Sequence, residues 1–158
     1  MNIPTEKPMF KRVGFDLDSR KSWDVQWRVA RLMDIAVSMN CDLYSFETRN
    51  GYHFKLYLPQ AVDLQEDMAI RAPYDSPGRL YWEDIRRGWV KRTSLKFLNQ
   101  FHDILHSFKL YPSGRIGVEE KEIHIVESGK VNPKTEKHLR EIGMLRREDE
   151  RFEPTVRP

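Results

Sequence analysis

The sequence predicts a single α+β domain whose core runs strand, helix, strand, strand, helix, strand. Asn50-Gly51 stands between two runs rich in aromatic and branched residues, which is the pattern of a β-hairpin. Apolar and polar residues alternate from 12 to 18, as in a strand with one buried side. Apolar residues from 25 to 37 recur at helical spacing. Helices on one side of such a sheet leave its other side open.

The hairpin is the central element of this prediction. A two-residue turn at 50–51 pairs residues across the ladder as Thr48 with His53, Phe46 with Lys55, and Tyr44 with Tyr57. These side chains share one face, which we expect to be an open working surface. The other face carries the apolar side chains expected to pack against helices, namely Leu43, Phe54, Leu56 and Leu58.

The strand predicted at 12–18 complements this surface. Its apolar residues at 13, 15 and 17 would be buried, whereas Asp16 and Asp18 point to the opposite side. Beside the hairpin in one sheet, this strand would place both carboxylates near His53 and Lys55.

Two carboxylates one residue apart on a strand can hold divalent cations for phosphoryl transfer. We therefore predict a metal site at Asp16 and Asp18 that takes Mg²⁺ or Mn²⁺, because carboxylate oxygens suit hard cations. The competing interpretation is that Asp18 and Ser19 turn the chain into the following helix, with Asp16 merely solvated.

The order of these motifs resembles the archaeo-eukaryotic primase superfamily. A strand with Asp-x-Asp (15–18), a helix, and a hairpin ending in Gly-Tyr-His (51–53) resemble the first two motifs of that family. The run Asp-Ser-Pro-Gly-Arg-Leu at 75–80, with a charged helix after it, is similar to the segment that comes after the hairpin in small primase-like proteins of archaea and their viruses or plasmids. The resemblance covers roughly residues 12 to 98.

The resemblance implies an RRM-like (ferredoxin-like) fold and a metal-dependent nucleotidyltransferase in DNA replication of an archaeal mobile element or its host. Its catalytic residues would be Asp16, Asp18 and His53, with His53 contacting the triphosphate. Such enzymes carry a third carboxylate on a later strand. The sequence does not place that residue, and the candidates by position after the hairpin are Asp75, Glu83 and Asp84.

Cations and aromatic side chains supply candidate contacts to DNA or RNA and to a nucleoside triphosphate. The basic cluster from 86 to 92 surrounds Trp89, although a basic helix end followed by a buried tryptophan explains it equally well. Aromatic side chains on an open sheet face stack on bases. The predicted contacts are Arg49, Lys55, Tyr44, Phe46, Tyr57, Arg79, Arg86, Arg87, Lys91 and Arg92.

Three other functions remain open. A non-catalytic accessory protein would use the aromatic face to bind nucleic acid, and a metal-dependent nuclease would use the same carboxylates. A structural homo-oligomer would bury the face against another copy. If residues 99 to 147 fold over the face, its aromatic residues belong to the core instead.

The remaining chain divides into an irregular N-terminus (1–10), the core with its extension (11–128), a charged helix (129–147) and a disordered tail (148–158). Within it we expect helices at 22–40, 63–70, 79–87 and 99–108, and strands at 93–98 and 122–127, the last at a sheet edge. His102 and His106 lie one helical turn apart, but no third ligand lies near them in sequence, so we expect no metal there.

Composition indicates a protein of the cytoplasm. Its 27 Lys and Arg against 24 Asp and Glu give a net charge of +3, which favours a polyanionic partner only weakly. No apolar run approaches the roughly 18 residues of a membrane span, and the N-terminus lacks the apolar core of a secretory signal. The single cysteine, Cys41, can form no internal disulfide.

Overall fold

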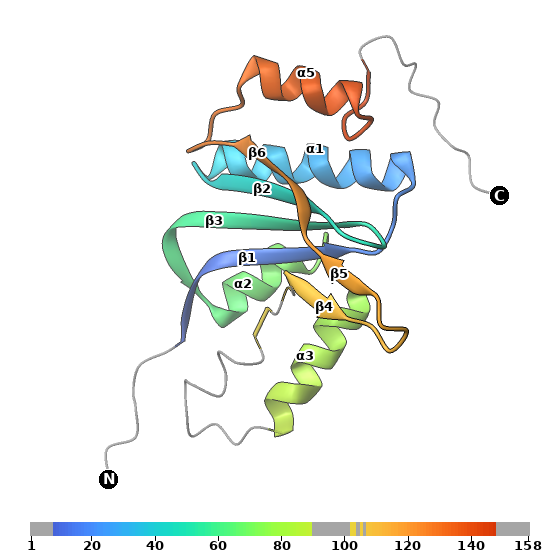
Figure 1. Cartoon of the computed structure of the whole chain (residues 1–158). Helices are drawn as coiled ribbons and strands as arrows, with labels where there is room; N and C mark the ends of the chain where they lie inside the picture. Colours follow the sequence, from blue (N-terminus) through green and yellow to red (C-terminus); the bar gives the residue numbers. More distant parts are fainter. Residues whose placement is uncertain (1–7, 90–101, 104, 106, 148–158) are drawn as a thin grey trace, which may run out of the picture.

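The structure, a computed structural model, describes residues 8–89, 102–103, 105 and 107–147, except for the side chains of 84–89 and 108. The main elements along the chain are β1 (Met9–Leu17), α1 (Ser22–Ser38), β2 (Asp42–Glu47), β3 (Tyr52–Asp63), α2 (Leu64–Arg71) and α3 (Pro77–Trp89). They are followed by β4 (Phe108–Leu110), β5 (Ile116–Val118), β6 (Glu120–Val126) and α5 (Pro133–Glu141) (Figure 1).

The α+β class is confirmed, with a main antiparallel sheet in the order β1-β3-β2-β6 and a separate β4-β5 hairpin. The expected edge strand at 122–127 corresponds to β6, which pairs with β2. In a ferredoxin-like unit the fourth strand lies beside the first. Here the fourth strand of the sheet lies beside β2, at the opposite edge. The strand expected at 93–98 lies outside the described residues.

The free edge of β1 is closed by side chains. The Gly14 amide donates to Asp103 Oδ2 at 2.6 Å, and the Asp16 amide donates to Asp75 Oδ1 at 2.9 Å. Arg79 Nη1 donates to the Gly14 carbonyl at 3.0 Å. These contacts take the backbone groups that a neighbouring strand would use, which is a physical reason why no second strand among the described residues pairs with this stretch of β1.

The pairing predicted across the hairpin was wrong by two residues. Phe46 pairs with His53 and Tyr44 with Lys55, because residues 48–51 form a four-residue loop in which the Thr48 amide donates to the Gly51 carbonyl at 2.9 Å. A shift of two residues keeps every side chain on its face, since side chains alternate along a strand. The faces are therefore as predicted, although the partners are not.

Gly51 is required by close approach and not by turn geometry. Its φ is not positive, unlike that of a residue in the mirror-image turns that favour Asn-Gly. A Cβ atom at this position would lie 1.8 Å from the Leu17 carbonyl oxygen. The hairpin loop thus rests on the end of β1, next to the two predicted carboxylates.

The predicted apolar face is confirmed as the core. Side chains of β1, β2 and β3 pack there against α1, and α5 adds Leu139 to the same cluster (Figure 1). The fully or almost fully buried members from β1, β2 and β3 are Val13, Phe15, Leu17, Leu43, Phe54, Leu56 and Leu58. Cys41 is buried as well. In the part of the chain that the structure describes, no helix has the length and apolar character to cross a membrane.

Candidate functional site

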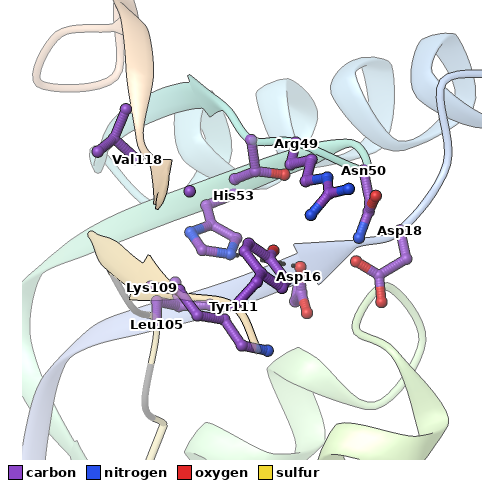
Figure 2. Close-up of a pocket in the computed structure, with 11 residues that line it drawn as sticks. Asp16, Asp18, Arg49, Asn50, His53, Leu105, Lys109, Tyr111 and Val118 are labelled. Carbon is purple, nitrogen blue, oxygen red and sulfur yellow. Dashed lines mark ion pairs between the residues drawn. The ribbon is translucent and has the colours of Figure 1, made fainter. Parts of the chain in front are cut away.

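The face opposite the core carries a pocket of about 180 Å³ where three parts of the chain meet (Figure 2). Strand β1 contributes Asp16, and Asp18 follows directly after its end. The hairpin contributes residues 48–50 and His53, and the β4-β5 segment closes the other side. Its residues from that segment are Leu105, Lys109, Tyr111, Gly117 and Val118. The structure therefore brings Asp16, Asp18 and His53 together, as the sequence predicted.

His53 lies between two carboxylates. It pairs with Asp16 across the β1-β3 ladder, and its Nε2 atom lies 3.4 Å from Asp16 Oδ1. Its Nδ1 atom lies 3.3 Å from Glu119 Oε1, and Lys55 Nζ lies 2.9 Å from Glu119 Oε2. The Glu119 side chain is only 5% exposed. Glu119 is thus a third carboxylate near the pocket, between β5 and β6, which sequence reasoning missed.

The pocket concentrates negative charge at Asp16 and Asp18. Burial raises the pKa of Asp18, and the neighbouring charge of Asp16 raises it further. The neighbouring His53 and Lys109 act on this pKa in the opposite direction without reversing the shift. A bound cation would relieve this repulsion, which is the electrostatic setting of a carboxylate metal site.

Two cations lie at the same pocket. Arg49 Cζ lies 4.7 Å and Lys109 Nζ 5.2 Å from the centre of the Tyr111 ring, which indicates cation–π contacts. Neither forms an ion pair with a carboxylate within the described part of the chain. Arg49 was predicted as a binding residue, whereas Lys109 and Tyr111 were not. Their charge is available to an anionic ligand.

The predicted aromatic surface borders a second, wider groove of about 750 Å³ that also includes Lys11 and Arg12. Tyr44 stacks on His124 with ring centres 4.2 Å apart and meets Tyr57 edge-on. Lys55 Nζ lies 4.5 Å above the Phe46 ring. Tyr57 is 40% exposed. The β4-β5 segment therefore lies at the end of the face near Asp16 but leaves these aromatic side chains at an open groove.

Other predicted residues lie elsewhere. Arg79 was predicted to contact nucleic acid, but it forms ion pairs with Asp75 and Asp103, and its side chain is only 13% exposed. Among the third-carboxylate candidates, Asp75 and Glu83 are buried in the same network and do not line the pocket. The side chains of Asp84, Arg86 and Arg87 fall outside the structural description, as do Lys91 and Arg92 entirely.

A buried network of charged side chains lies next to the pocket. Arg71 has no exposed surface, and its guanidinium lies 3.0 Å from Asp75 Oδ2, 2.6 Å from Glu83 Oε2 and 3.6 Å from Asp67 Oδ2. Burial alone would lower the pKa of Arg71, but the bond to Glu83 and the surrounding carboxylates raise it above its ordinary value. Asp75 links this network to the pocket, since it also binds the amide of Asp16.

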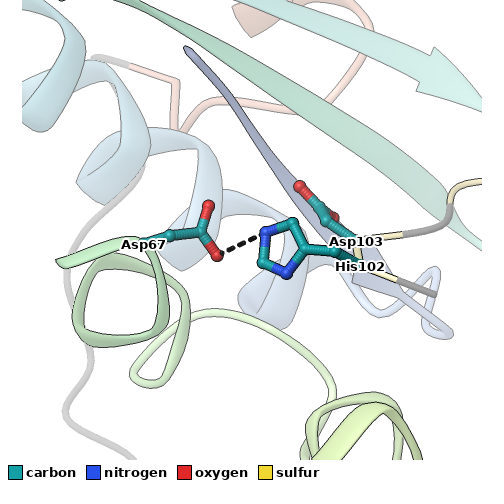
Figure 3. A group of neighbouring side chains, drawn as sticks. All are labelled: Asp67, His102 and Asp103. Carbon is teal, nitrogen blue, oxygen red and sulfur yellow. Dashed lines mark ion pairs between the residues drawn. The ribbon is translucent and has the colours of Figure 1, made fainter. Parts of the chain in front are cut away.

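The same network contains a group that could hold a metal ion. Ligand atoms of Asp67, His102 and Asp103 lie within 4.8 Å of one another, and all three residues are buried (Figure 3). Sequence reasoning found no third ligand beside His102, whereas the fold brings Asp67 of α2 to 3.1 Å from its Nε2 atom. His106 lies outside the described residues. Asp16, Asp18 and His53 do not form so tight a group of three.

Comparisons with known proteins give no match. Neither the protein-family models, nor the curated protein sequences, nor the solved structures contain a significant relative of this chain.

Proposed function

We propose that this protein is a metal-dependent nucleotidyltransferase that binds a nucleoside triphosphate at Asp16, Asp18 and His53. The observation that carries the proposal is the convergence of these residues in one pocket beside Arg49 and Lys109. Carboxylates that can hold metal ions and cations that can neutralise phosphate oxygens are the groups that phosphoryl transfer uses. The resemblance to the archaeo-eukaryotic primase superfamily adds support, and it favours a role in DNA replication.

The donor chemistry at Asp16 and Asp18 fits Mg²⁺ or Mn²⁺. Both residues offer carboxylate oxygens, and the raised pKa of Asp18 reflects burial and like charge that a dication would offset. When bound, such ions neutralise phosphate oxygens and activate the attacking hydroxyl. The dissociated form of each carboxylate is the one that serves as ligand.

The remaining residues have distinct tasks in this proposal. His53, set between Asp16 and Glu119, would present a ring N–H to a phosphate oxygen. Glu119 would orient His53 and Lys55. Arg49 and Lys109 would neutralise the triphosphate. In the reaction, a nucleic-acid 3′-hydroxyl would pass its proton to solvent water and attack the α-phosphorus, and the bond from that phosphorus to the leaving pyrophosphate would break.

Substituting either carboxylate tests this proposal. Asp16→Asn and Asp18→Asn should each lower metal-dependent incorporation of labelled nucleotides by roughly 100-fold or more, because metal ions supply several kcal/mol of charge stabilisation. Denaturing gels of reactions with DNA and RNA templates, with and without primers, measure the product. Asp34→Asn is the matched control, since this substitution removes the same charge from an exposed position of α1.

Two outcomes would contradict polymerisation. Incorporation that is equal in the wild type and both variants would place the activity elsewhere. Shortening of labelled strands in Mg²⁺ or Mn²⁺, lost in Asp16→Asn and Asp18→Asn, would identify a nuclease that uses the same carboxylates.

A second candidate function is single-strand binding without catalysis, favoured by the open aromatic groove at Tyr44, Phe46 and Tyr57. Tyr57→Ala should weaken single-stranded DNA or RNA binding by roughly 5-fold to 100-fold, because stacking contributes about 1–3 kcal/mol per base. Fluorescence anisotropy measures the affinity. Trp23→Ala is the control, since Trp23 is an aromatic residue on α1 that is more exposed than Tyr57, at 57% against 40%.

The two functions separate in a combined assay. Binding that is lost in Tyr57→Ala but retained in Asp16→Asn, with no incorporation by the wild type, would favour the accessory role. Unchanged affinity in Tyr57→Ala would exclude the groove as the nucleic-acid surface.

A further inference from the structure

We propose that Asp67, His102 and Asp103 bind one Zn²⁺ ion in the buried charge network, at a site separate from Asp16 and Asp18. Asp67 comes from α2, and the other two ligands come from the segment ahead of β4. His102 Nε2 lies 3.1 Å from Asp67 Oδ2. Zinc ligands at about 2.0–2.2 Å from the metal are separated by roughly 3.4 Å in a tetrahedron. The ligand atoms lie within 4.8 Å of one another, so binding would draw the widest pair together by up to about 1.4 Å.

The carboxylate of Asp67 points to a missing ligand. Asp67 has no exposed surface, and its Oδ1 atom has no hydrogen-bond partner. Its Oδ2 atom lies 3.6 Å from Arg71 Nη1, which is longer than a hydrogen bond. Burying a carboxylate with an unsatisfied oxygen is costly unless a cation compensates it. Figure 3 shows this carboxylate directed towards the His102 ring.

The surroundings of His102 are those of a metal ligand. Its Nδ1 atom lies 2.9 Å from Glu83 Oε1, and its ring stacks on Phe10 with centres 3.7 Å apart. A carboxylate on one ring nitrogen fixes the tautomer and orientation that present the other nitrogen to a metal. Nε2, the other nitrogen, is the one on the side of Asp67.

The charge of the network also favours a dication. Four buried carboxylates surround two guanidiniums, those of Arg71 and Arg79, and the imidazole of His102, so the carboxylates outnumber the cations even when the ring is protonated. A dication bound to a neutral imidazole would balance this excess. The carboxylates are those of Asp67, Asp75, Glu83 and Asp103. Imidazole with carboxylates selects zinc over magnesium, in contrast to the oxygen donors of Asp16 and Asp18.

The ion would have a structural consequence. Asp103 Oδ2 accepts the amide hydrogen of Gly14 at 2.6 Å, and a Cβ atom on Gly14 would lie 2.5 Å from Asp103 Oδ1. Zinc would therefore join α2 to Asp103, whose side chain binds β1 at Gly14, two residues before Asp16. Binding of zinc at this site should stabilise the fold, but this zinc would not serve as the metal ion at Asp16 and Asp18.

Metal analysis of the whole protein tests this inference. After treatment with chelator, reloading with Zn²⁺ and desalting, about one zinc per chain should remain, and Tm should rise by about 5–10 °C in excess zinc. Mg²⁺ should give no comparable rise. His102→Gln and Asp67→Asn should each lose the bound zinc, whereas Asp16→Asn, at the separate pocket, should retain it.

A second measurement on the wild type covers the case in which those variants do not fold. The imidazole NMR signals of His102, one of five histidines, should shift on adding one equivalent of Zn²⁺. Absence of retained zinc, loss of zinc in Asp16→Asn instead, or unshifted His102 signals would each overturn the proposal.

Discussion

Replacing Arg71 with methionine should destabilise the protein by about 3–5 kcal/mol, because it leaves buried carboxylates without their cation. Arg71 contacts Asp75, Glu83 and Asp67 and has no exposed surface. Urea denaturation followed by circular dichroism measures the loss, and a soluble but unfolded product would be its extreme form. The loss of stability should appear as a lower urea concentration at the unfolding midpoint, with the slope of the transition nearly unchanged.

The effect should depend on pH in a defined direction. Burial already raises the pKa of Asp75, and losing Arg71 would raise it further. A group whose pKa is higher in the folded state than in the unfolded state binds more protons when folded, so it favours folding as the pH falls. The deficit of Arg71→Met relative to the wild type should therefore narrow between neutral pH and about pH 4.

Arg140→Met is the control for this prediction. Arg140 pairs with Glu136 one turn away on α5, and both side chains are partly exposed. Such a surface pair contributes about 0.3–0.5 kcal/mol. Equal midpoints for Arg71→Met and Arg140→Met would show that the buried network does not hold the fold together.

Gly51→Ala should cost about 3 kcal/mol, at the upper end for overpacking, because the new Cβ atom would meet backbone. That atom would lie 1.8 Å from the Leu17 carbonyl oxygen and 2.8 Å from the Ser19 amide nitrogen. The loop must move away from the end of β1, which separates His53 from Asp16. Both thermal stability and nucleotide incorporation should fall.

Gly78→Ala separates this effect from any general cost of replacing glycine. Gly78 lies in the first turn of α3, where a Cβ atom would approach only Ser76 Oγ, at 4.0 Å. Alanine there should be neutral or stabilising by up to about 1 kcal/mol. A Gly51→Ala protein as stable as Gly78→Ala would contradict the close packing at Leu17.

Alternation along the strands was enough to predict β1, the hairpin and their buried face, since the period of two is a local property. The hairpin register was not predictable in the same way. Asn50-Gly51 indicates a mirror-image turn when glycine is needed for positive φ, but here Gly51 serves a contact with β1 that is distant in sequence. The faces were still correct because the shift was even.

The missed site residues have a common cause. Glu119, Lys109 and Tyr111 reach the pocket only because the β4-β5 segment crosses the sheet, and no short-range pattern marks that crossing. Lys109 and Tyr111 stand just ahead of a tight turn at Pro112, and Glu119 lies between two strands, and neither position indicates the Asp16 pocket. The pairing of Asp16 with His53, in contrast, depends on two neighbouring strands and was accessible to pattern reasoning.

The sequence spacing of the charged residues in the buried network did not indicate that they are buried. Asp67, Arg71, Asp75, Arg79 and Glu83 alternate in sign at every fourth position. That spacing is typical of ion pairs on a solvated helix surface. The structure buries four of these residues almost completely and leaves little of the fifth exposed. Sequence alone does not distinguish the two cases, because burial depends on what the rest of the chain places over the helix.

The edge of β1, whose backbone groups are bound by side chains, affects how copies of this protein can associate. An unpaired edge strand is a template on which a second chain can add its own strand, the usual start of β-aggregation. From Gly14 to Asp16 the outward amides and carbonyl are already bound by Asp103, Asp75 and Arg79. An incoming strand would have to displace these charged partners first, so the sheet resists growth on the side that carries its acidic pocket.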